Sequence, residues 1–289
     1  MKIMFIDFMK HRKTALLVSL ACVVLSLVLV FTKGLNLGID FTGGNVVQVE
    51  FSANVAVGEI RDVLSSVGQG GAVIQSYSDT GVIIRISTIE DEARKVVVDA
   101  LRAKHPDMQV VRLEKVGPVV GAELREEAFI ALFLALAGIL VYITVRFQFR
   151  FAVVSVLALM HDAIITLGIF SLTWMEISSP FIAAILTIVG YSLNDTIVVL
   201  DRVRENWRHL RGEGILGLLN MSINQILSRT INTSLTTLLP VIALFLWGGP
   251  VLRSFSFALL VGITVGTYSS IYIASSVLAE WALKSPQKG

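Results

Sequence analysis

The sequence predicts a polytopic α-helical membrane protein with six transmembrane helices and an α+β domain inserted between the first two. Apolar residues make up 54% of the 289-residue chain and charged residues only 16%, whereas roughly a quarter of an ordinary soluble domain is charged. The apolar residues are concentrated in long runs. This composition excludes a soluble enzyme and a disordered chain, and the single cysteine excludes a disulfide scaffold. The net charge of +2 gives no indication of a nucleic-acid partner.

Six runs are long enough to cross a hydrocarbon core about 30 Å thick, which needs roughly 20 apolar residues in a helix. The first follows a basic stretch, as the apolar part of a secretory signal does, but it is too long for one and lacks a good cleavage site. We therefore expect a retained first helix, followed after the insertion by a five-helix bundle within residues 126–283. The six predicted helices are residues 14–32, 128–145, 151–173, 180–200, 230–247 and 255–283.

The basic residues predict the orientation, because short cytoplasmic loops carry an excess of Lys and Arg. On the opposite side, the short loops between helices contain a single basic residue, Arg253. We expect both termini in the cytoplasm and residues 33–125 outside it. The segments that carry the basic excess are residues 1–13, 146–150, 201–229 and 284–289.

The inserted segment has the pattern of a folded, water-facing domain with charges of both signs. Strand-like alternation and helical periodicity follow one another in the order βαββαβ. That order predicts a ferredoxin-like domain, with two helices on one antiparallel sheet. The expected elements are residues 46–51, 57–67, 72–78, 81–87, 90–104 and 109–116.

One cytoplasmic segment also shows helical periodicity. Leu216, Leu219, Ile223 and Ile226 are spaced along one face of residues 215–227. We expect an amphipathic helix on the membrane surface within the loop 201–229, serving as an interfacial lever or a site for cytoplasmic partners.

Glycine-containing stretches stand where the chain enters and leaves the inserted domain. Glycine permits positive φ and close backbone approach, so we expect a hinge or stem here, although an ordinary loop explains the glycines alone equally well. Neither stretch is a phosphate loop, because no Gly-Lys-Ser/Thr follows. The residues concerned are Gly38, Asp40, Gly43 and Gly44 in the first stretch and Gly117, Pro118 and Gly121 in the second.

Four motifs together resemble those of the bacterial SecD/SecF protein-export family, in the order and membrane setting of its SecF half. The resemblance covers nearly the whole chain. It implies the resistance-nodulation-division architecture, in which two six-helix halves pack together, so SecD would supply the other half. The motifs are Gly38-Ile39-Asp40-Phe41-Thr42-Gly43-Gly44, the stretch 116–125 beginning Val116-Gly117-Pro118, the stretch 192–206 beginning Ser192-Leu193-Asn194-Asp195-Thr196, and Ser228-Arg229-Thr230-Ile231-Asn232-Thr233-Ser234.

Ionisable residues inside the predicted helices are the candidate functional groups, since charges at that depth are costly unless paired, protonated or facing water. Asp195 is about 22 Å from Pro180 at 1.5 Å per residue, and Arg229 about 27 Å from Trp247. Antiparallel neighbours would bring the two to similar depth, and we expect them to handle protons. Asp201 fits the solvated end of the helix, and Arg229 alone would also fit an interfacial anchor.

The third predicted helix carries a second polar pair near its middle. His161 is equally well explained as a hydrogen-bonded packing residue. Asp162 is harder to dismiss, and we expect it to be protonated or bonded to the fourth helix, for example to Asn194. A role as proton relay or helix contact follows for Asp162.

The sixth predicted helix has small residues at every fourth position, which are Ala258, Gly262, Gly266, Ser270 and Ala274. Such a stripe lets helix backbones approach closely in lipid, so we expect a packing face, turned either to its own bundle or to SecD.

The leading functional hypothesis is a non-enzymatic, proton-driven export subunit without cofactor or metal, since the sequence has no Walker motif, nucleophile elbow or metal-ligand cluster. The resemblance implies a bacterial inner-membrane protein that works with SecD, the SecYEG channel and the unfolded polypeptide, with YajC and YidC as further candidate partners. Two alternatives are half of a small-molecule efflux transporter of the same superfamily and a purely structural assembly subunit. Sodium could replace protons as the coupling ion.

Overall fold

The computed structural model describes residues 5–209 and 214–284, which form two compact units. One consists of the chain up to Asn36 together with the chain from Ile130 onward, and the other is Leu37–Phe129. Six helices are long and apolar enough to span a membrane. The predicted tail 284–289 lies outside the described residues except for Lys284, as do residues 1–4 of the N-terminal segment.

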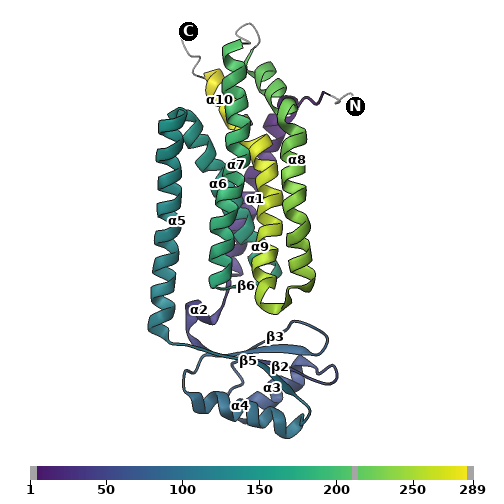
Figure 1. Ribbon diagram of the computed structural model, residues 1–289. Coiled ribbons are helices and arrows are strands. Elements are labelled where there is room, and N and C mark those ends of the chain that lie inside the picture. The colour runs from purple at the N-terminus through teal and green to yellow at the C-terminus, as the bar shows by residue number, and fades with distance from the viewer. Residues whose placement is uncertain (1–4, 210–213, 285–289) are drawn as a thin grey trace. The chain divides into compact units, whose positions relative to one another are not determined.

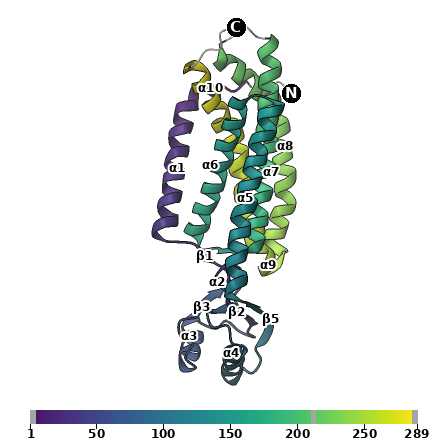
Figure 2. The same ribbon diagram turned by 90° about the vertical axis from the view of Figure 1, so that its left-hand side faces the viewer.

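The helical unit is built from long helices that run side by side (Figure 1). Helix α1 packs on α6, and α7 packs on both α8 and α9 (Figure 2). The buried apolar cluster includes Ile143, Phe151, Leu200 and Leu278. The helices are α1 (Arg12–Thr32), α5 (Pro118–Arg146), α6 (Phe149–Thr173), α7 (Ser179–His209), α8 (Ile215–Trp247), α9 (Gly249–Tyr268) and α10 (Ser275–Lys284), with the 3-10 turn η1 (Met9–His11) and the π segment η2 (Ser269–Ala274).

The predicted loop 201–229 is wrong in its secondary structure. Helix α7 continues to His209, and α8 begins at Ile215 and runs through to Trp247 without a break. The expected surface helix is therefore the first part of α8. Its apolar face is covered by protein instead of lipid, because Leu219 and Ile223 are fully buried in the core cluster. Pro240 stands inside α8, where a membrane helix tolerates proline.

The N-terminal segment is fastened to α8 by two asparagines. Asn220 Oδ1 accepts a hydrogen bond from Met9 N at 2.9 Å, and Asn224 both accepts from Ile6 N and donates to Ile6 O. Asn220 Nδ2 also donates to Asp7 Oδ1 at 2.6 Å. That hydrogen bond, together with one from the Lys10 backbone, lowers the pKa of the Asp7 carboxyl. Asp7 is thus held as a carboxylate although it lies at the surface.

The second unit is a four-stranded antiparallel sheet with strand order β3-β4-β2-β5. Its elements follow the order expected from the sequence, and α3 and α4 lie on one face of the sheet (Figure 1). Val47 on the central strand pairs with Ile84 and Leu113 and is fully buried. The elements are β2 (Gly44–Glu50), α3 (Val57–Ser66), β3 (Val73–Ser76), β4 (Gly81–Ile86), α4 (Asp91–Lys104) and β5 (Gln109–Val116), preceded by the short helix α2 (Ile39–Thr42). Two short strands remain: β1 (Asn36–Leu37), where the chain passes into this unit, and β6 (Glu176–Ile177), which belongs to the helical unit.

Candidate functional site

Polar side chains from four helices are buried together inside the helical unit. The polar residues of α7 that face inward are Ser192, Asp195 and Thr196, and their spacing of three and four places them on one helix face. Among the described residues, no group of three or more His, Cys, Asp or Glu side chains could hold a metal ion. The site consists of carboxyl and hydroxyl groups and one imidazole within a helix bundle.

Asp162 on α6 is the better satisfied of the two buried carboxylates and is only 1% exposed. Its Oδ2 accepts hydrogen bonds from Ser192 Oγ at 2.6 Å and Ser269 Oγ at 2.8 Å. Its Oδ1 lies 2.9 Å from His161 Nδ1. Three polar side chains therefore surround this one carboxyl group.

The expected partner of Asp162, Asn194, is not in this cluster. Asn194 is exposed, and Ser192 takes its place. Two residues correspond to about 200° around an α-helix, so the face that carries Ser192 cannot also carry Asn194. The hydrogen bond from α7 to Asp162 is therefore made by Ser192 and not by the expected Asn194.

His161 has one satisfied ring nitrogen and one unsatisfied. Its Nε2 is buried without a hydrogen-bond partner, and its ring lies 6.4 Å from that of Tyr268. His161 therefore contacts Asp162 through Nδ1, and its other ring nitrogen faces the packed interior beside Tyr268.

The π segment η2 supplies two hydroxyls that sequence reasoning missed. Ser269 donates to Asp162, and Ser270 Oγ lies 2.8 Å from Thr196 Oγ1. Consecutive residues of an α-helix are about 100° apart, and the wider π turn brings both serines inward. Such π bulges occur frequently at functional sites. The stripe of small residues was the only available sequence signal, since it included Ser270.

Asp195 on α7 is 2% exposed but poorly satisfied. Within the described part of the chain, its side chain accepts one hydrogen bond, from Ser234 Oγ at 3.5 Å, the outer limit of such bonds. Ser234 Oγ is also 2.7 Å from Thr267 Oγ1. Asp195 is therefore a nearly unsolvated carboxyl without a strong partner.

Arg229 does not pair with Asp195 in this structure. It is exposed on α8, and the two side chains, both described, form no ion pair within 4.0 Å. Ser234, and not Arg229, is level with Asp195. Arg229 is five residues earlier on α8, about 7.5 Å along the helix. Asp201 is exposed on α7, which continues beyond it to His209.

The small-residue stripe of α9 faces α7 of the same chain. A Cβ atom added at Gly266 would lie 2.9 Å from Ser192 Cβ and 3.4 Å from Asp162 Oδ2, and one added at Gly262 would collide with Ile188. Because Gly266 has no side chain, α9 can pack closely on α7 without pressing on the Ser192 and Asp162 side chains that share a hydrogen bond.

The glycine stretches belong to the second unit. Gly43 and Gly44 have φ of 71° and 122°, and a Cβ at Gly44 would collide with the Ile86 carbonyl. A Cβ at Gly121 would lie 3.2 Å from the Phe41 carbonyl carbon. Gly38 precedes α2, Asp40 is half-buried within it, and Gly117 precedes Pro118, the first residue of α5.

Comparison with known proteins decides the family. The model described as "Protein export membrane protein SecD/SecF, C-terminal" matches residues 96–284, and that described as "SecD/SecF GG Motif" matches residues 28–55. The chain belongs to the SecD/SecF protein-export family. Membership of this family, together with the six apolar helices of the described chain, indicates a multi-pass inner-membrane protein.

Two SecF relatives are similar to this chain over nearly their full length. The protein translocase subunit SecF of Desulfurispirillum indicum is 48% identical, covering 96% of this chain and 92% of the relative. That of Pseudomonas aeruginosa is 46% identical with the same coverage. The crystal structure of SecDF from Thermus thermophilus matches with a TM-score of 0.91 at 43% identity, over 96% of this chain and 39% of the SecDF chain. This chain thus spans about two fifths of the SecDF chain.

Proposed function

We propose that this protein is the SecF-type half of a proton-driven translocase that promotes Sec-dependent protein export together with SecD. Support comes from SecF-named relatives that match nearly the whole chain and from SecDF, in which a matching region is part of a longer chain. The observation that carries the proton-driven part is the pair of buried carboxylates, Asp162 and Asp195. The two SecF relatives are named as protein translocase subunits.

The two carboxylates differ in a way that suggests different roles. Asp162 has three polar contacts and serves as a fixed hydrogen-bonding centre that holds α6, α7 and η2 together. Asp195 has one long hydrogen bond and is the group that gains and loses a proton. Asn194 has no part in this proposal, because it faces away from the cluster.

In this proposal, the position of Arg229 decides whether Asp195 holds or releases its proton. Arginine remains charged at any physiological pH, so the proton must be carried by the carboxylate. While Arg229 forms no ion pair with Asp195, as between the described side chains here, the buried carboxyl can take up a proton. When α8 shifts by about one turn and brings the guanidinium close, Asp195 releases its proton.

The proton gradient is sufficient as an energy source. One elementary charge crossing 100 mV supplies about 2.3 kcal/mol, enough to bias two packings of a helix pair. We infer that both termini are cytoplasmic and that the second unit is a ferredoxin-like extracytoplasmic domain whose movement, through the Gly38–Gly44 and Gly117–Gly121 stretches, assists the emerging polypeptide. Its strand order, numbered within the domain, is 2-3-1-4. SecYEG is the expected channel, with YajC and YidC as further partners.

The test is proton uptake by proteoliposomes that contain this chain and SecD. Asp195→Asn keeps the side-chain size and removes the titration, so it should abolish proton-dependent export while assembly with SecD persists. Asp201→Asn is the matched control on the same helix. Normal export by Asp195→Asn with unchanged dependence on the gradient would refute the proton site, and replacement of the proton by a sodium gradient would refute proton coupling. Export that needs neither gradient would favour the structural-subunit alternative.

A further inference from the structure

The chain leaves the helical unit at a point that is held by a hydrogen bond to the end of α6. Asn36 is the last residue of that unit before Leu37 begins the second one. Asn36 is buried, and its Nδ2 donates to the Trp174 carbonyl at 2.9 Å. Trp174 directly follows Thr173, the last residue of α6. The exit of the chain is therefore attached to α6 as well as to α1.

A buried serine holds the residues that precede this exit. Ser171 on α6 is fully buried, and its Oγ lies 2.7 Å from the Gly34 carbonyl oxygen and 3.0 Å from that of Leu29. Its single hydroxyl proton is thus shared between carbonyl groups in the last turn of α1 and just after it. Gly34 has φ of 80°, a conformation that glycine adopts without strain, so the chain can turn from α1 across Ser171.

Lys33 and Trp174 reinforce the same junction. Lys33 Nζ donates to the Leu172 carbonyl at 2.7 Å and lies 5.6 Å from the centre of the Trp174 ring. Trp174 has φ of 57°, a left-handed conformation that is uncommon for a residue with a side chain. Glycine would adopt it more readily, but the tryptophan ring provides the aromatic face that the Lys33 cation contacts. Together these residues form the exit clasp: Lys33, Gly34, Asn36, Ser171 and Trp174.

Helices α1 and α6 also pack closely before the exit clasp is reached. A Cβ added at Gly168 on α6 would lie 2.2 Å from Ser26 Oγ on α1. Gly168, Ser171 and Trp174 recur at every third position, which places them along one side of α6. The ends of the two helices are thus fixed to each other, so a displacement of α6 carries the end of α1 with it.

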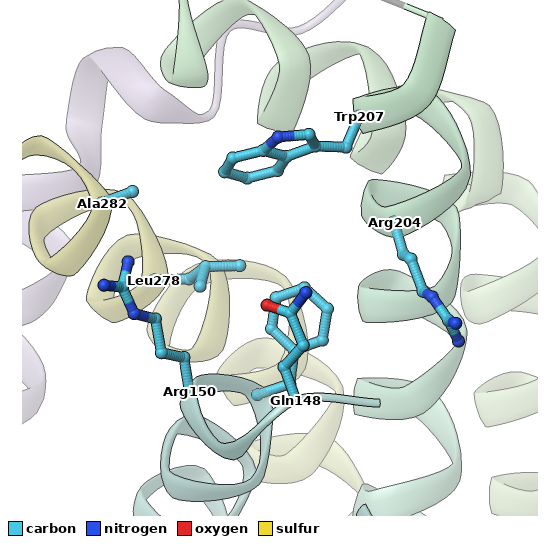
Figure 3. A pocket seen from close by; sticks show the side chains of 7 residues that line it. Gln148, Arg150, Arg204, Trp207, Leu278 and Ala282 are labelled. Carbon is cyan, nitrogen blue, oxygen red and sulfur yellow. The ribbon is translucent and has the colours of Figure 1, made fainter. Parts of the chain in front are cut away.

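Helix α6 connects the exit clasp to the buried carboxylates. Asp162 and Ser171 are about 13.5 Å apart along α6 at 1.5 Å per residue, and Ser192 of α7 donates to Asp162. At its beginning, α6 contributes Arg150 and Phe151 to the lining of a cavity of about 190 Å³, which α7 and α10 also line (Figure 3). Helix α6 therefore extends from this cavity past Asp162 to the exit clasp.

We propose that the exit clasp transmits movement of α6 to the second unit, with Ser171 and Asn36 as its positioning residues. This inference rests on the proposed function, because it names how a change at the buried carboxylates reaches the second unit. Asn36 is bonded directly to Leu37, so a displacement of α6 arrives at the start of that unit without an intervening flexible linker. The other connection between the units runs within α5, where Phe129 and Ile130 are exposed. A helix with so little buried surface is poorly placed to follow α6.

The experiment measures proton uptake and gradient-dependent export on proteoliposomes that contain this chain, SecD and the rest of the translocation system. Asn36→Ala and Ser171→Ala should leave proton uptake unchanged and lower export about tenfold, the equivalent of one buried hydrogen-bond partner lost. Residues that only stabilise the bundle would affect both measurements equally. Thr32→Ala and Thr173→Ala are the matched controls, since these exposed hydroxyls donate to carbonyls of their own helices and should leave export unchanged.

Lys33 provides a test that does not depend on the folding of the two buried variants, because its side chain is exposed. Lys33→Met should lower export about threefold, as expected for the loss of an exposed cation–π contact, and Lys33→Arg should restore it. Wild-type export by Lys33→Met, or by both Ala variants, would overturn the proposal, and so would an equal loss of proton uptake and export. Unchanged proton uptake by Asp195→Asn on the same proteoliposomes would instead refute the proposed function, so the two failures are distinguishable.

Discussion

Ser269, the first residue of the π segment, donates a 2.8 Å hydrogen bond to the carboxylate of Asp162 on α6. Ser192 of α7 donates to the same oxygen, so three helical elements meet at one buried atom. A carboxylate at this point joins the helices only while it can accept from both hydroxyls. The local geometry of η2 and the charge of Asp162 are therefore linked.

Ser269→Ala should destabilise the protein by about 1.5–3 kcal/mol, since it removes a hydrogen bond to a charged group. Ser275 offers a matched control six residues later, because its hydroxyl is buried without a partner, and Ser275→Ala should be nearly neutral. Unfolding in increasing sodium dodecyl sulfate, followed by circular dichroism, measures both. Equal losses of stability would show that the serine-to-carboxylate bond contributes nothing.

Arg229→Met should leave stability within about 0.5 kcal/mol of the wild type, as expected for an exposed side chain away from special features, yet abolish proton-dependent export. The reason is that Arg229 has no ion pair with Asp195 in this structure and would act on it only after α8 moves. Proton uptake and thermal unfolding are measured on the same preparation. Wild-type uptake by the variant would remove Arg229 from the mechanism.

Gly266→Ala should destabilise the helical unit by about 1–3 kcal/mol, the usual cost of overpacking, because the new Cβ presses on Ser192. Gly190→Ala on α7 is its control, since no other atom lies within 4 Å of a Cβ there. In a helix, that change should be neutral or slightly stabilising. Detergent unfolding of both variants decides whether the α7–α9 contact is as close as described.

Gly44→Ala should impair export and destabilise the second unit, because φ is 122° and a Cβ would meet the Ile86 carbonyl. Gly58→Ala, on α3 with open space around its Cα, should be tolerated. Pulse-labelled export in cells and the yield of assembled complex are the two readouts. Full export by Gly44→Ala would exclude a strict need for glycine at the predicted stem.

Docking of the N-terminal segment should weaken in acid. The pKa of Asp7 is lowered in the folded protein, chiefly by the Asn220 hydrogen bond, so its contribution is complete well above the ordinary aspartate value of about 4. It is lost as the pH falls below that value, through the lowered pKa. Asp7→Asn should abolish this pH dependence, which limited proteolysis of the N-terminal segment between pH 6 and pH 3 would measure.

The sequence identified what depends on composition and periodicity. The apolar runs, the βαββαβ order and the buried positions of Asp162 and Asp195 all follow from patterns within single segments. The partners of these carboxylates do not, because they depend on how one helix is rotated against another. Ser192 instead of Asn194, and Ser234 instead of Arg229, are differences of about half a turn and more than one turn. The π segment was also unpredictable, since serines in an apolar helix are equally compatible with a regular turn.

The unbroken course of α8 has a consequence for any motion of Arg229. Helix α8 carries both Asn220 and Ser234, about 21 Å apart at 1.5 Å per residue. Asn220 holds the N-terminal segment, and Ser234 contacts Asp195. The part of α8 before Pro240 has no proline to bend it. A shift that carries Arg229 toward Asp195 must therefore also move Asn220 and Asn224, which hold Ile6 and Met9 by hydrogen bonds. Each proton exchange in the bundle would then displace the segment before α1.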